Sequence, residues 1–359
     1  MSSSVESKPE AADPSRPHHG LRVKHWIETS QVNIVKEALE NGMDPNVILD
    51  DFDRWFPLAW AARYNQHEIM ELLIQHGANV NMTDENGCDA LKIAVYGNNA
   101  WGLERLVAAG AHVNHISKAG DTVLHLACHQ GNTLFVRRLL QLGAAPCINA
   151  IDDNGQSPLL IAASKGHFLT VKEMLANGAD VSIIWRGKTI LYYAVTSGSF
   201  QTVRLIVEAG AAILSDHVEL AIDMCLVDIV HYLCVTKHYG LNTENKDGIT
   251  PLMYACQKKP ELVEPLLAMG ADPSYRNKDG MSALCYALDQ ANMTAVEQLL
   301  ACGAEITDQE LSHMDCHRED LRSLLSRHTL TVNVGRRNMR DKRKVASCTV
   351  EDRDGVKKG

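Results

Sequence analysis

Apolar residues recur at helical spacing in the stretch 121–143, DTVLHLACHQGNTLFVRRLLQLG. Leu124 and Ala127 form one short apolar face, and a second face follows the break at Gly131-Asn132 with Leu134, Phe135, Leu139 and Leu140. This spacing predicts two short helices joined by a tight turn. Thr122 lies where a side-chain oxygen can accept from the free N–H groups of a first turn, and Gly143 lies where a helix end needs a residue that tolerates positive φ.

A pair of helices this short cannot bury its apolar side alone and needs neighbours with the same pattern. The chain supplies them, because a Leu followed three residues later by Ala recurs at Leu58/Ala61, Leu91/Ala94, Leu124/Ala127, Leu159/Ala162, Leu191/Ala194, Leu252/Ala255 and Leu284/Ala287. Most copies continue into a Leu-rich helix closed by a glycine: Gly77, Gly110, Gly143, Gly178, Gly210, Gly270 and Gly303. These glycines are 32 to 35 residues apart except for one step of 60, which predicts a degenerate unit at about 211–240.

The period, with the words Gly155-Gln-Ser-Pro-Leu, Gly248-Ile-Thr-Pro-Leu and Thr122-Val-Leu-His-Leu-Ala, resembles the ankyrin repeat. The resemblance covers roughly residues 22 to 328. It implies an all-α ankyrin-repeat solenoid of about nine helix-turn-helix units with projecting hairpin fingers between them. We expect the array at 21–328, with capping units at about 21–42 and 304–328.

The same resemblance implies a structural role for His125. In similar proteins the imidazole at this position ties neighbouring loops together by hydrogen bonds. The other units carry Ala59, Lys92, Leu160, Tyr192, Met253 and Cys285 there, so we expect the network to be incomplete.

The two ends of the chain differ from the array in composition. Residues 1–20 are rich in Ser, Pro and Glu, and we expect them to be disordered because they lack the apolar content that repays ordering. Residues 329–359 are also expected to be disordered, and they carry nine basic against four acidic residues, or +5. Their clusters, Arg336-Arg337 and Lys342-Arg343-Lys344, are either a nuclear import signal or a solvating charge run.

Net charge is −9, so everything before the basic tail amounts to −14. An acidic array argues against nucleic acid as its ligand and favours a protein partner with a basic surface. The ten cysteines contain no Cys-x-x-Cys, and no apolar leader begins the chain, which indicates reduced thiols in a cytoplasmic or nuclear protein. No apolar stretch approaches the ~20 residues that span a bilayer. We expect a monomer that does not enter a membrane.

Motifs for catalysis or for a cofactor are weak. Gly187-Lys188-Thr189 matches the end of a phosphate-binding loop, but Ser182 stands where that loop requires its first glycine, and Thr189 has the position of a helix cap. His313, Cys316 and His317 would share one face of a helix, but a fourth zinc ligand is not evident. No Ser or Cys nucleophile has a recognisable base motif nearby. We therefore expect no cofactor, no metal and no enzyme activity.

The leading hypothesis is a non-catalytic scaffold that holds a partner on its concave groove and finger tips. Groove candidates on the first helices are Arg63, Tyr64, Tyr96, His129, Gln130, Ser164, Lys165, Thr196 and Ser197. Candidates at the finger tips are Phe52, Asp53, Trp55, Asp84, Glu85, Lys118, Asp152, Asp153, Trp185 and Arg186. We expect Asp152 and Asp153 to serve binding and to contribute almost nothing to stability.

Several of these positions allow two interpretations. Phe52 and Trp55 are either exposed anchors beside acids or, in the case of Trp55 with Phe56, cover the first repeat joint. The tip around Trp185 either contacts a partner or packs on its neighbour. Pro265 should kink its helix, which makes 211–270 either the place where the stack bends or an ordinary degenerate stretch.

Two more specific functions remain as alternatives to a general scaffold. The first is a substrate-recognition adaptor of a ubiquitin ligase, but such relatives append a helical box, and no apolar segment of that kind follows His328. The second is a nuclear regulator that binds a transcription factor, with the basic tail giving import.

Overall fold

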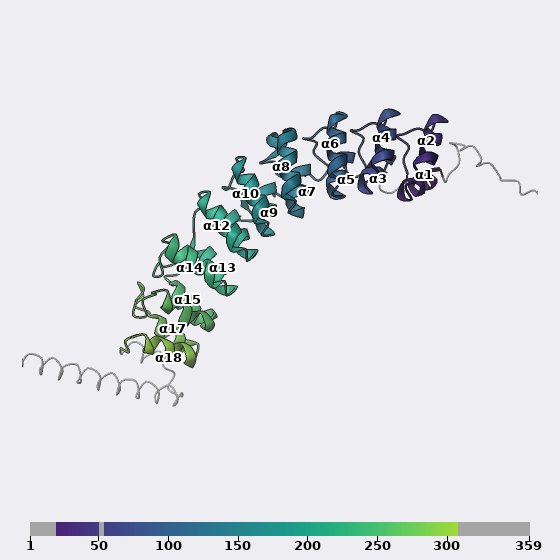
Figure 1. Ribbon diagram of the computed structural model, residues 1–359. Coiled ribbons are helices and arrows are strands. Elements are labelled where there is room, and N and C mark those ends of the chain that lie inside the picture. Colours follow the sequence, from purple (N-terminus) through teal and green to yellow (C-terminus); the bar gives the residue numbers. More distant parts are fainter. Residues whose placement is uncertain (1–18, 50–53, 308–359) are drawn as a thin grey trace, which may run out of the picture. The chain divides into compact units, whose positions relative to one another are not determined.

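The computed structural model describes residues 19–49 and 54–307 of the chain. Within that part the chain forms eighteen α-helices, α1 to α18, arranged as nine helix-turn-helix pairs (Figure 1). This confirms the predicted all-α repeat fold. The contacts divide the chain into two compact units, one ending at Ala212 and the other beginning at Ile213.

The first unit contains six helix pairs. Its first helices are α1 (His19–Glu28), α3 (Pro57–Arg63), α5 (Ala90–Tyr96), α7 (Val123–Gln130), α9 (Pro158–Ser164) and α11 (Ile190–Thr196). Its second helices are α2 (Val32–Glu40), α4 (His67–Gln75), α6 (Ala100–Ala108), α8 (Thr133–Leu139), α10 (Phe168–Ala176) and α12 (Phe200–Glu208). Helix α8 continues into a π-helical turn, Leu140–Ala144, and a 3-10 turn, Ala145–Cys147.

The second unit contains three pairs among its described residues. They are α13 (Ser215–Asp223) with α14 (Val227–His231), α15 (Pro251–Lys258) with α16 (Val263–Ala268), and α17 (Ala283–Asp289) with α18 (Met293–Ala301). A π-helical turn, Tyr232–Thr236, follows α14, and a 3-10 turn, Pro260–Leu262, precedes α16. The first pair occupies the segment expected to be a degenerate unit. The expected C-terminal capping unit lies almost wholly outside the described residues, as do the first eighteen residues and the basic tail.

Seven of the nine described pairs carry the Leu-x-x-Ala word, and each of them buries its leucine. Leu58, Leu91, Leu124, Leu159 and Leu191 are all fully buried in the first unit. Helix α3 contacts both α1 and α5, and α7 contacts both α5 and α9, so these side chains lie between successive first helices. Burial of one such side chain contributes about 1.5–3 kcal/mol. Figure 1 shows the first helices of this unit along one edge and the second helices along the other.

Local signals fix where the helices begin and end. The side chains of Ser157 and Asp89 accept the backbone N–H of the third residue of the helix that follows each of them, α9 and α5, as N-caps do. Thr189 caps α11 in the same way, as expected. Gly143 closes the second helix of its pair at φ 105°, a conformation that costs glycine nothing, which confirms its predicted role.

A residue in the left-handed region turns the chain between the two helices of most pairs. The six pairs of the first unit place Ser30, Asn65, Asn98, Gly131, Gly166 and Gly198 there. The second unit uses Cys225 at φ 57° and Ala291 at φ 53°. An Asn or a Gly tolerates this conformation, whereas a Cys or an Ala adopts it with strain.

One segment between pairs forms a short hairpin. Strands β1 (Ile184–Trp185) and β2 (Lys188–Thr189) pair antiparallel, with Ile184 opposite Thr189 and Trp185 opposite Lys188. Arg186 and Gly187 both have positive φ, which matches the two-residue turn that suits the twist of a hairpin. The segment Gly187-Lys188-Thr189 is therefore part of a finger and of a helix cap.

Pro265 was expected to kink its helix, but the structure places it in the first turn of the helix. Helix α16 begins at Val263, after the 3-10 turn, so Pro265 is its third residue. The first N–H groups of an α-helix have no partner within the helix, so the missing N–H of a proline in the first turn breaks no helical bond. Pro265 therefore lies at the start of a shortened second helix.

Candidate functional site

His125 links two successive fingers through both of its ring nitrogens. Nδ1 accepts the backbone N–H of Thr122 at 3.0 Å, which leaves the proton on Nε2, and Nε2 lies 3.2 Å from the carbonyl oxygen of Gln156. Burial lowers the pKa of His125, so the imidazole is neutral, as this bonding requires. The structural role expected for His125 is thus confirmed.

A lysine makes the corresponding link in the preceding repeat. Lys92 is buried, and its Nζ donates to Oδ1 of Asp121 in the next finger at 2.6 Å. Burial alone would raise the pKa of Asp121, but hydrogen bonds from Lys92 and Ser117 outweigh it and leave the pKa below its usual value. Sequence reasoning treated Lys92 as a gap in the network, whereas a longer cationic side chain fills the position.

Two acids predicted at finger tips are structural. Asp84 is buried, and its Oδ1 accepts the backbone N–H groups of Asn86 and Cys88. Asp152 is half-buried and binds Asn154 and Gln156 in the same way. Both carboxylates therefore hold the turn of their own finger together, a role that the sequence did not indicate and that the expected near-zero contribution of Asp152 to stability leaves out. Their contact with a partner stays a prediction.

Other finger candidates remain on the surface. Glu85 and Lys118, on adjacent fingers, are exposed and form an ion pair at 3.5 Å. Asp153 is also exposed, and its backbone N–H bonds the carbonyl of Ala119 in the preceding finger. An exposed ion pair of this kind contributes about 0–1 kcal/mol.

Trp185 packs on its neighbouring finger, which was one of its two interpretations. Its indole Nε1 donates to the carbonyl oxygen of Asn154 at 2.6 Å, and its ring lies 5.0 Å from that of Tyr193. The exposed guanidinium of Arg186 lies over the indole, 4.5 Å from the ring centroid. This tip therefore presents a cation on a fixed aromatic base.

The aromatic residues of the first long finger divide between core and surface. Phe56 is buried at the start of α3, as the inward interpretation expected. Trp55 is half-buried with its ring edge-on to Trp60 at 4.6 Å. Phe52 and Asp53, the other candidates of this finger, lie outside the described residues.

A row of aromatic side chains begins at Trp60 and runs across successive first helices. Tyr64 is the C-cap that directly follows α3, with its ring 5.6 Å from that of Trp60, and Tyr96 is the last residue of α5 one repeat later. The guanidinium of Arg63 lies 4.6 Å from the ring centroid of Tyr96 and joins the two repeats. Tyr64 is 45% exposed and Tyr96 is 54% exposed. We call Trp60, Arg63, Tyr64 and Tyr96 the aromatic row; the structure brings three of the predicted groove residues together in it.

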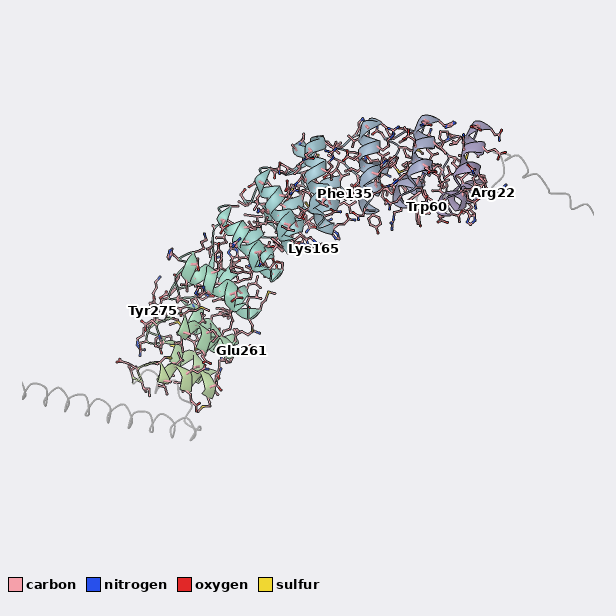
Figure 2. All side chains as sticks on the ribbon, viewed as in Figure 1. Arg22, Trp60, Phe135, Lys165, Glu261 and Tyr275 are labelled. Atoms are coloured by element: carbon pink, nitrogen blue, oxygen red, sulfur yellow. The ribbon has the colours of Figure 1, made fainter. Side chains whose placement is uncertain are left out.

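Polar residues continue this surface beyond the aromatic row. Gln130, at the end of α7, donates through Nε2 to the carbonyl of Tyr96 at 3.2 Å. His129 is exposed, and its carbonyl lies 3.3 Å from Nε2 of His167. Partial burial, followed by the nearby positive charge of Lys165, lowers the pKa of His129. Figure 2 shows Trp60 and Lys165 at the edge of the first unit that the first helices form.

A ladder of ion pairs connects the second helices of the first unit. Arg105 on α6 binds Glu71 on α4 through two nitrogens, at 2.5 and 3.0 Å. Arg138 on α8 binds Glu104 on α6, and Arg137 on α8 binds Glu173 on α10. The hydrogen bond from its arginine lowers the pKa of each glutamate. Each pair spans about one repeat, so these charges belong to the array itself.

Carboxylates of the second unit accept from neutral donors. Oδ2 of Asp223 accepts the hydroxyl of Tyr254, and Oε1 of Glu219 accepts the amide of Asn245, both at 2.9 Å. Oε1 of Glu244 accepts the hydroxyl of Tyr275 at 3.1 Å. Sequence reasoning missed this cluster. The signal available in the sequence was an acid about one repeat before a tyrosine. The degenerate unit lacks the Leu-x-x-Ala pattern that would have aligned its residues with those of the next repeat.

The described residues contain no group of three metal-ligating side chains, and the cluster His313, Cys316 and His317 lies outside them. Among the helices of the described ranges, none is long and apolar enough to cross a membrane. The geometry instead provides rows of fixed side chains that another polypeptide can contact.

The chain resembles parts of much longer proteins. It is 27% identical over 302 residues to the human transient receptor potential cation channel subfamily A member 1. The matched stretch covers 78% of this chain and 24% of the channel. It is 29% identical over 189 residues to the palmitoyltransferase AKR1 of Lachancea kluyveri, covering 52% of this chain and 21% of that protein. It is 31% identical over 118 residues to the putative ankyrin repeat protein FPV022 of fowlpox virus, and the match covers 32% of this chain and 20% of that protein.

The chain thus spans about a quarter or less of the length of these relatives. The family model for ankyrin repeats in three copies matches at residues 26–117, 98–184, 148–217 and 219–310. These matches together cover the helix pairs from α2 to α18. Sequence period, helix pairing and family match agree, and the chain belongs to the ankyrin-repeat family.

Proposed function

We propose that this chain is a non-catalytic scaffold that holds a partner protein against the aromatic row of the first unit. The observation that carries the proposal is the placement of Tyr64 and Tyr96, which are about half exposed yet fixed at the ends of two packed helices. Aromatic side chains of this kind are frequent anchors in protein interfaces, and preordering reduces the entropy lost on binding.

The partner is proposed to have a basic surface. The described residues from 213 onward include thirteen acids and six bases, which amounts to −7. A field of this sign raises the association rate of a basic protein at low ionic strength. The aromatic row then supplies short-range contacts, because Arg63 already lies on the ring of Tyr96 and leaves its outward N–H groups to acceptors on the partner.

Photo-crosslinking in cells tests the aromatic row. A photoreactive amino acid replaces Tyr64 in one full-length chain and Leu134 in a second one. Leu134 is the matched control, because it is apolar and 73% exposed but lies on the second helix α8. We expect one protein to crosslink at 64 and not at 134.

The captured protein is then purified and its affinity measured. We expect Tyr64→Ala with Tyr96→Ala to weaken binding by about 30-fold or more, the effect of losing two anchors, while Leu134→Ala leaves it unchanged. Equal crosslinking at both positions, or an unchanged affinity of the double variant, would remove the aromatic row as the binding surface.

We also propose that the chain acts as a monomer in the cytoplasm or nucleus. The proposal rests on the scattered cysteines and on the basic clusters of the tail. A fluorescent reporter fused to residues 329–359 separates the two compartments. Nuclear accumulation that disappears when Lys342, Arg343 and Lys344 become Gln would assign import to the tail.

A further inference from the structure

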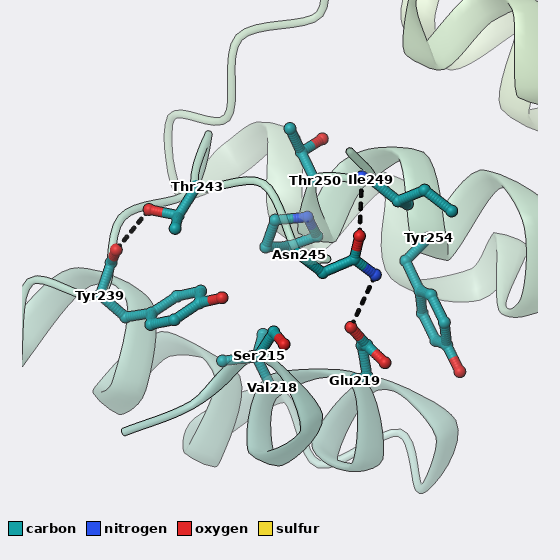
Figure 3. A pocket seen from close by; sticks show the side chains of 10 residues that line it. Ser215, Val218, Glu219, Tyr239, Thr243, Asn245, Ile249, Thr250 and Tyr254 are labelled. Atoms are coloured by element: carbon teal, nitrogen blue, oxygen red, sulfur yellow. Dashed lines mark hydrogen bonds between the residues drawn. The ribbon is translucent and has the colours of Figure 1, made fainter. Parts of the chain in front are cut away.

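A small open hollow lies in the second unit between α13, the start of α15 and the chain that joins their pairs. Its polar lining consists mainly of Ser215, Glu219, Tyr239, Thr243, Asn245 and Tyr254. In Figure 3 the side chain of Glu219 rises from α13, with Tyr239 on one side and Tyr254 on the other. We call it the Glu219 hollow.

Hydrogen bonds fix the groups around the Glu219 hollow. Oδ1 of Asn245 accepts the backbone N–H of Ile249 at 2.8 Å, which orients the amide so that Nδ2 donates to Oε1 of Glu219 (Figure 3). The hydroxyl of Tyr254 donates to Asp223, and burial together with this hydrogen bond raises the pKa of Tyr254 to about 12. Burial also raises the pKa of Tyr239, so both phenols stay neutral at physiological pH.

The charge of this region is strongly negative. Helix α13 alone carries Asp216, Glu219 and Asp223, and none of the ten lining residues is basic. The amide of Asn245 is neutral and compensates no charge. A carboxylate between aromatic rings suits an arginine or lysine side chain, which gains a charge-assisted hydrogen bond and a cation–π contact together.

The same chain contains a basic segment of complementary charge. Residues 336–344 contain Arg336, Arg337, Arg340, Lys342, Arg343 and Lys344 with one acid, Asp341. The described chain ends at Thr307 in the second unit, and 28 residues separate it from Arg336. Because the segment belongs to the same chain, tethering gives it an effective concentration on the order of millimolar.

We propose that the Glu219 hollow binds an arginine or lysine side chain and that its resident ligand is the basic segment 336–344 of the same chain. The occupied hollow masks part of the negative field that would attract a basic partner. The tail is then a competitor that regulates access to the second unit. This inference does not depend on the aromatic row, and its test does not involve that surface.

A labelled peptide of residues 333–347 tests the proposal by fluorescence anisotropy on full-length chains. In one chain the six basic residues of 336–344 are replaced by Gln, which frees the hollow from its own tail. We expect the peptide to bind this chain at least about tenfold more tightly than the wild type, since the tethered tail competes at high effective concentration. Equal affinity for both chains would overturn occupancy by the tail, and absence of binding to both would overturn the site.

Matched variants locate the site within the second unit. In the tail-neutralised chain, Glu219→Gln removes the charge and keeps an oxygen for Asn245, so it should weaken the peptide about tenfold without unfolding the unit. Glu297→Gln, an exposed acid of α18 that does not line the hollow, should leave the affinity unchanged. An equal loss in both variants would mean diffuse attraction and would overturn the Glu219 hollow as the binding site.

A zero-length carbodiimide crosslink in the unaltered chain gives an independent measurement. We expect Lys342 or Lys344 to crosslink to Asp216, Glu219 or Asp223 within one molecule, and the product to disappear at high salt. Crosslinks of the tail spread evenly over acids of both units would contradict the proposal. Crosslinks that form only between molecules would assign the segment to a second copy.

Discussion

The two units use their acidic side chains differently. In the first unit Glu71, Glu104 and Glu173 bind arginines of neighbouring second helices. In the second unit Glu219 and Asp223 accept from an amide and a phenol. The described first unit has sixteen acids and fifteen bases, or −1, whereas the described second unit amounts to −7.

This difference shows that the same fold can either neutralise its carboxylates with its own arginines or leave their negative charge uncompensated. An arginine that bridges two repeats neutralises the carboxylate it binds, and the repeat surface becomes nearly neutral. A tyrosine or an asparagine orients the carboxylate equally well but leaves its charge unchanged. The second unit therefore keeps a negative field that can act on a ligand, and the first unit offers fixed aromatic contacts.

Truncation of one buried leucine in each unit should give the largest effect and test whether the units are separate. Leu124→Ala should destabilise the first unit by about 2–5 kcal/mol, because a filled joint loses contacts that cannot re-form. Leu252→Ala, equally buried in α15, should do the same to the second. Hydrogen exchange, analysed separately for residues before and after Ala212, measures the stability of each unit in both variants. A loss of protection spread over both units by either variant would mean that the boundary has no thermodynamic meaning.

Substitution at the left-handed turn between two helices should have a smaller effect than a leucine truncation, and in the second unit it should stabilise rather than destabilise. Ala291→Gly relieves a left-handed alanine and should stabilise the second unit by about 0.5–1 kcal/mol, after the greater flexibility of unfolded glycine is subtracted. Asn98→Gly at the equivalent turn of the first unit is the contrast, and it should not stabilise: Asn tolerates the conformation, and its Oδ1 accepts a hydrogen bond from Nδ2 of Asn132 at 2.8 Å that glycine would lose. Thermal unfolding checks both variants. Destabilisation by Ala291→Gly would show that the turn is not strained.

Salt should give the smallest effect and act on the two units in opposite directions. Raising the salt concentration from about 0.05 to 0.5 M weakens the exposed ion pairs of the first unit and should cost it less than about 1 kcal/mol. The same change screens the repulsion among acids of the second unit and should stabilise it by a similar amount. Hydrogen exchange at both salt concentrations measures the two shifts. Shifts of the same sign would show that carboxylate pairing does not distinguish the units.

The sequence predicted the parts that depend on burial and backbone conformation. Leu124 and Ala127 marked a buried face, Gly143 marked a helix end, and His125 marked a link between fingers. The buried face and the helix end follow from residue type and spacing, because only a few residues fit a buried joint or a left-handed backbone. The role of His125 was implied by the resemblance to ankyrin repeats.

The direction in which a polar side chain points was not predictable in the same way. Asp84 and Asp152 have the composition of contact residues, but their oxygens face the backbone of their own loops. Trp185 has the composition of an exposed anchor, yet its indole bonds the preceding finger. Glu219 and Asp223 were missed because α13 has no Leu-x-x-Ala word to set its register. In each case the deciding partner lies in a loop or in the next repeat.

The bonds between repeats also constrain how this chain can evolve. The hydrogen bonds and ion pairs that join neighbouring pairs connect residues 26 to 38 positions apart, from Asn245 with Glu219 to His167 with His129. Substitutions in related genes should therefore accumulate as couples separated by about one period. Deletion of a whole repeat leaves the remaining bonded residues one repeat apart. Deletion of a single codon within a repeat changes the spacing of every bonded pair on either side of the deleted position.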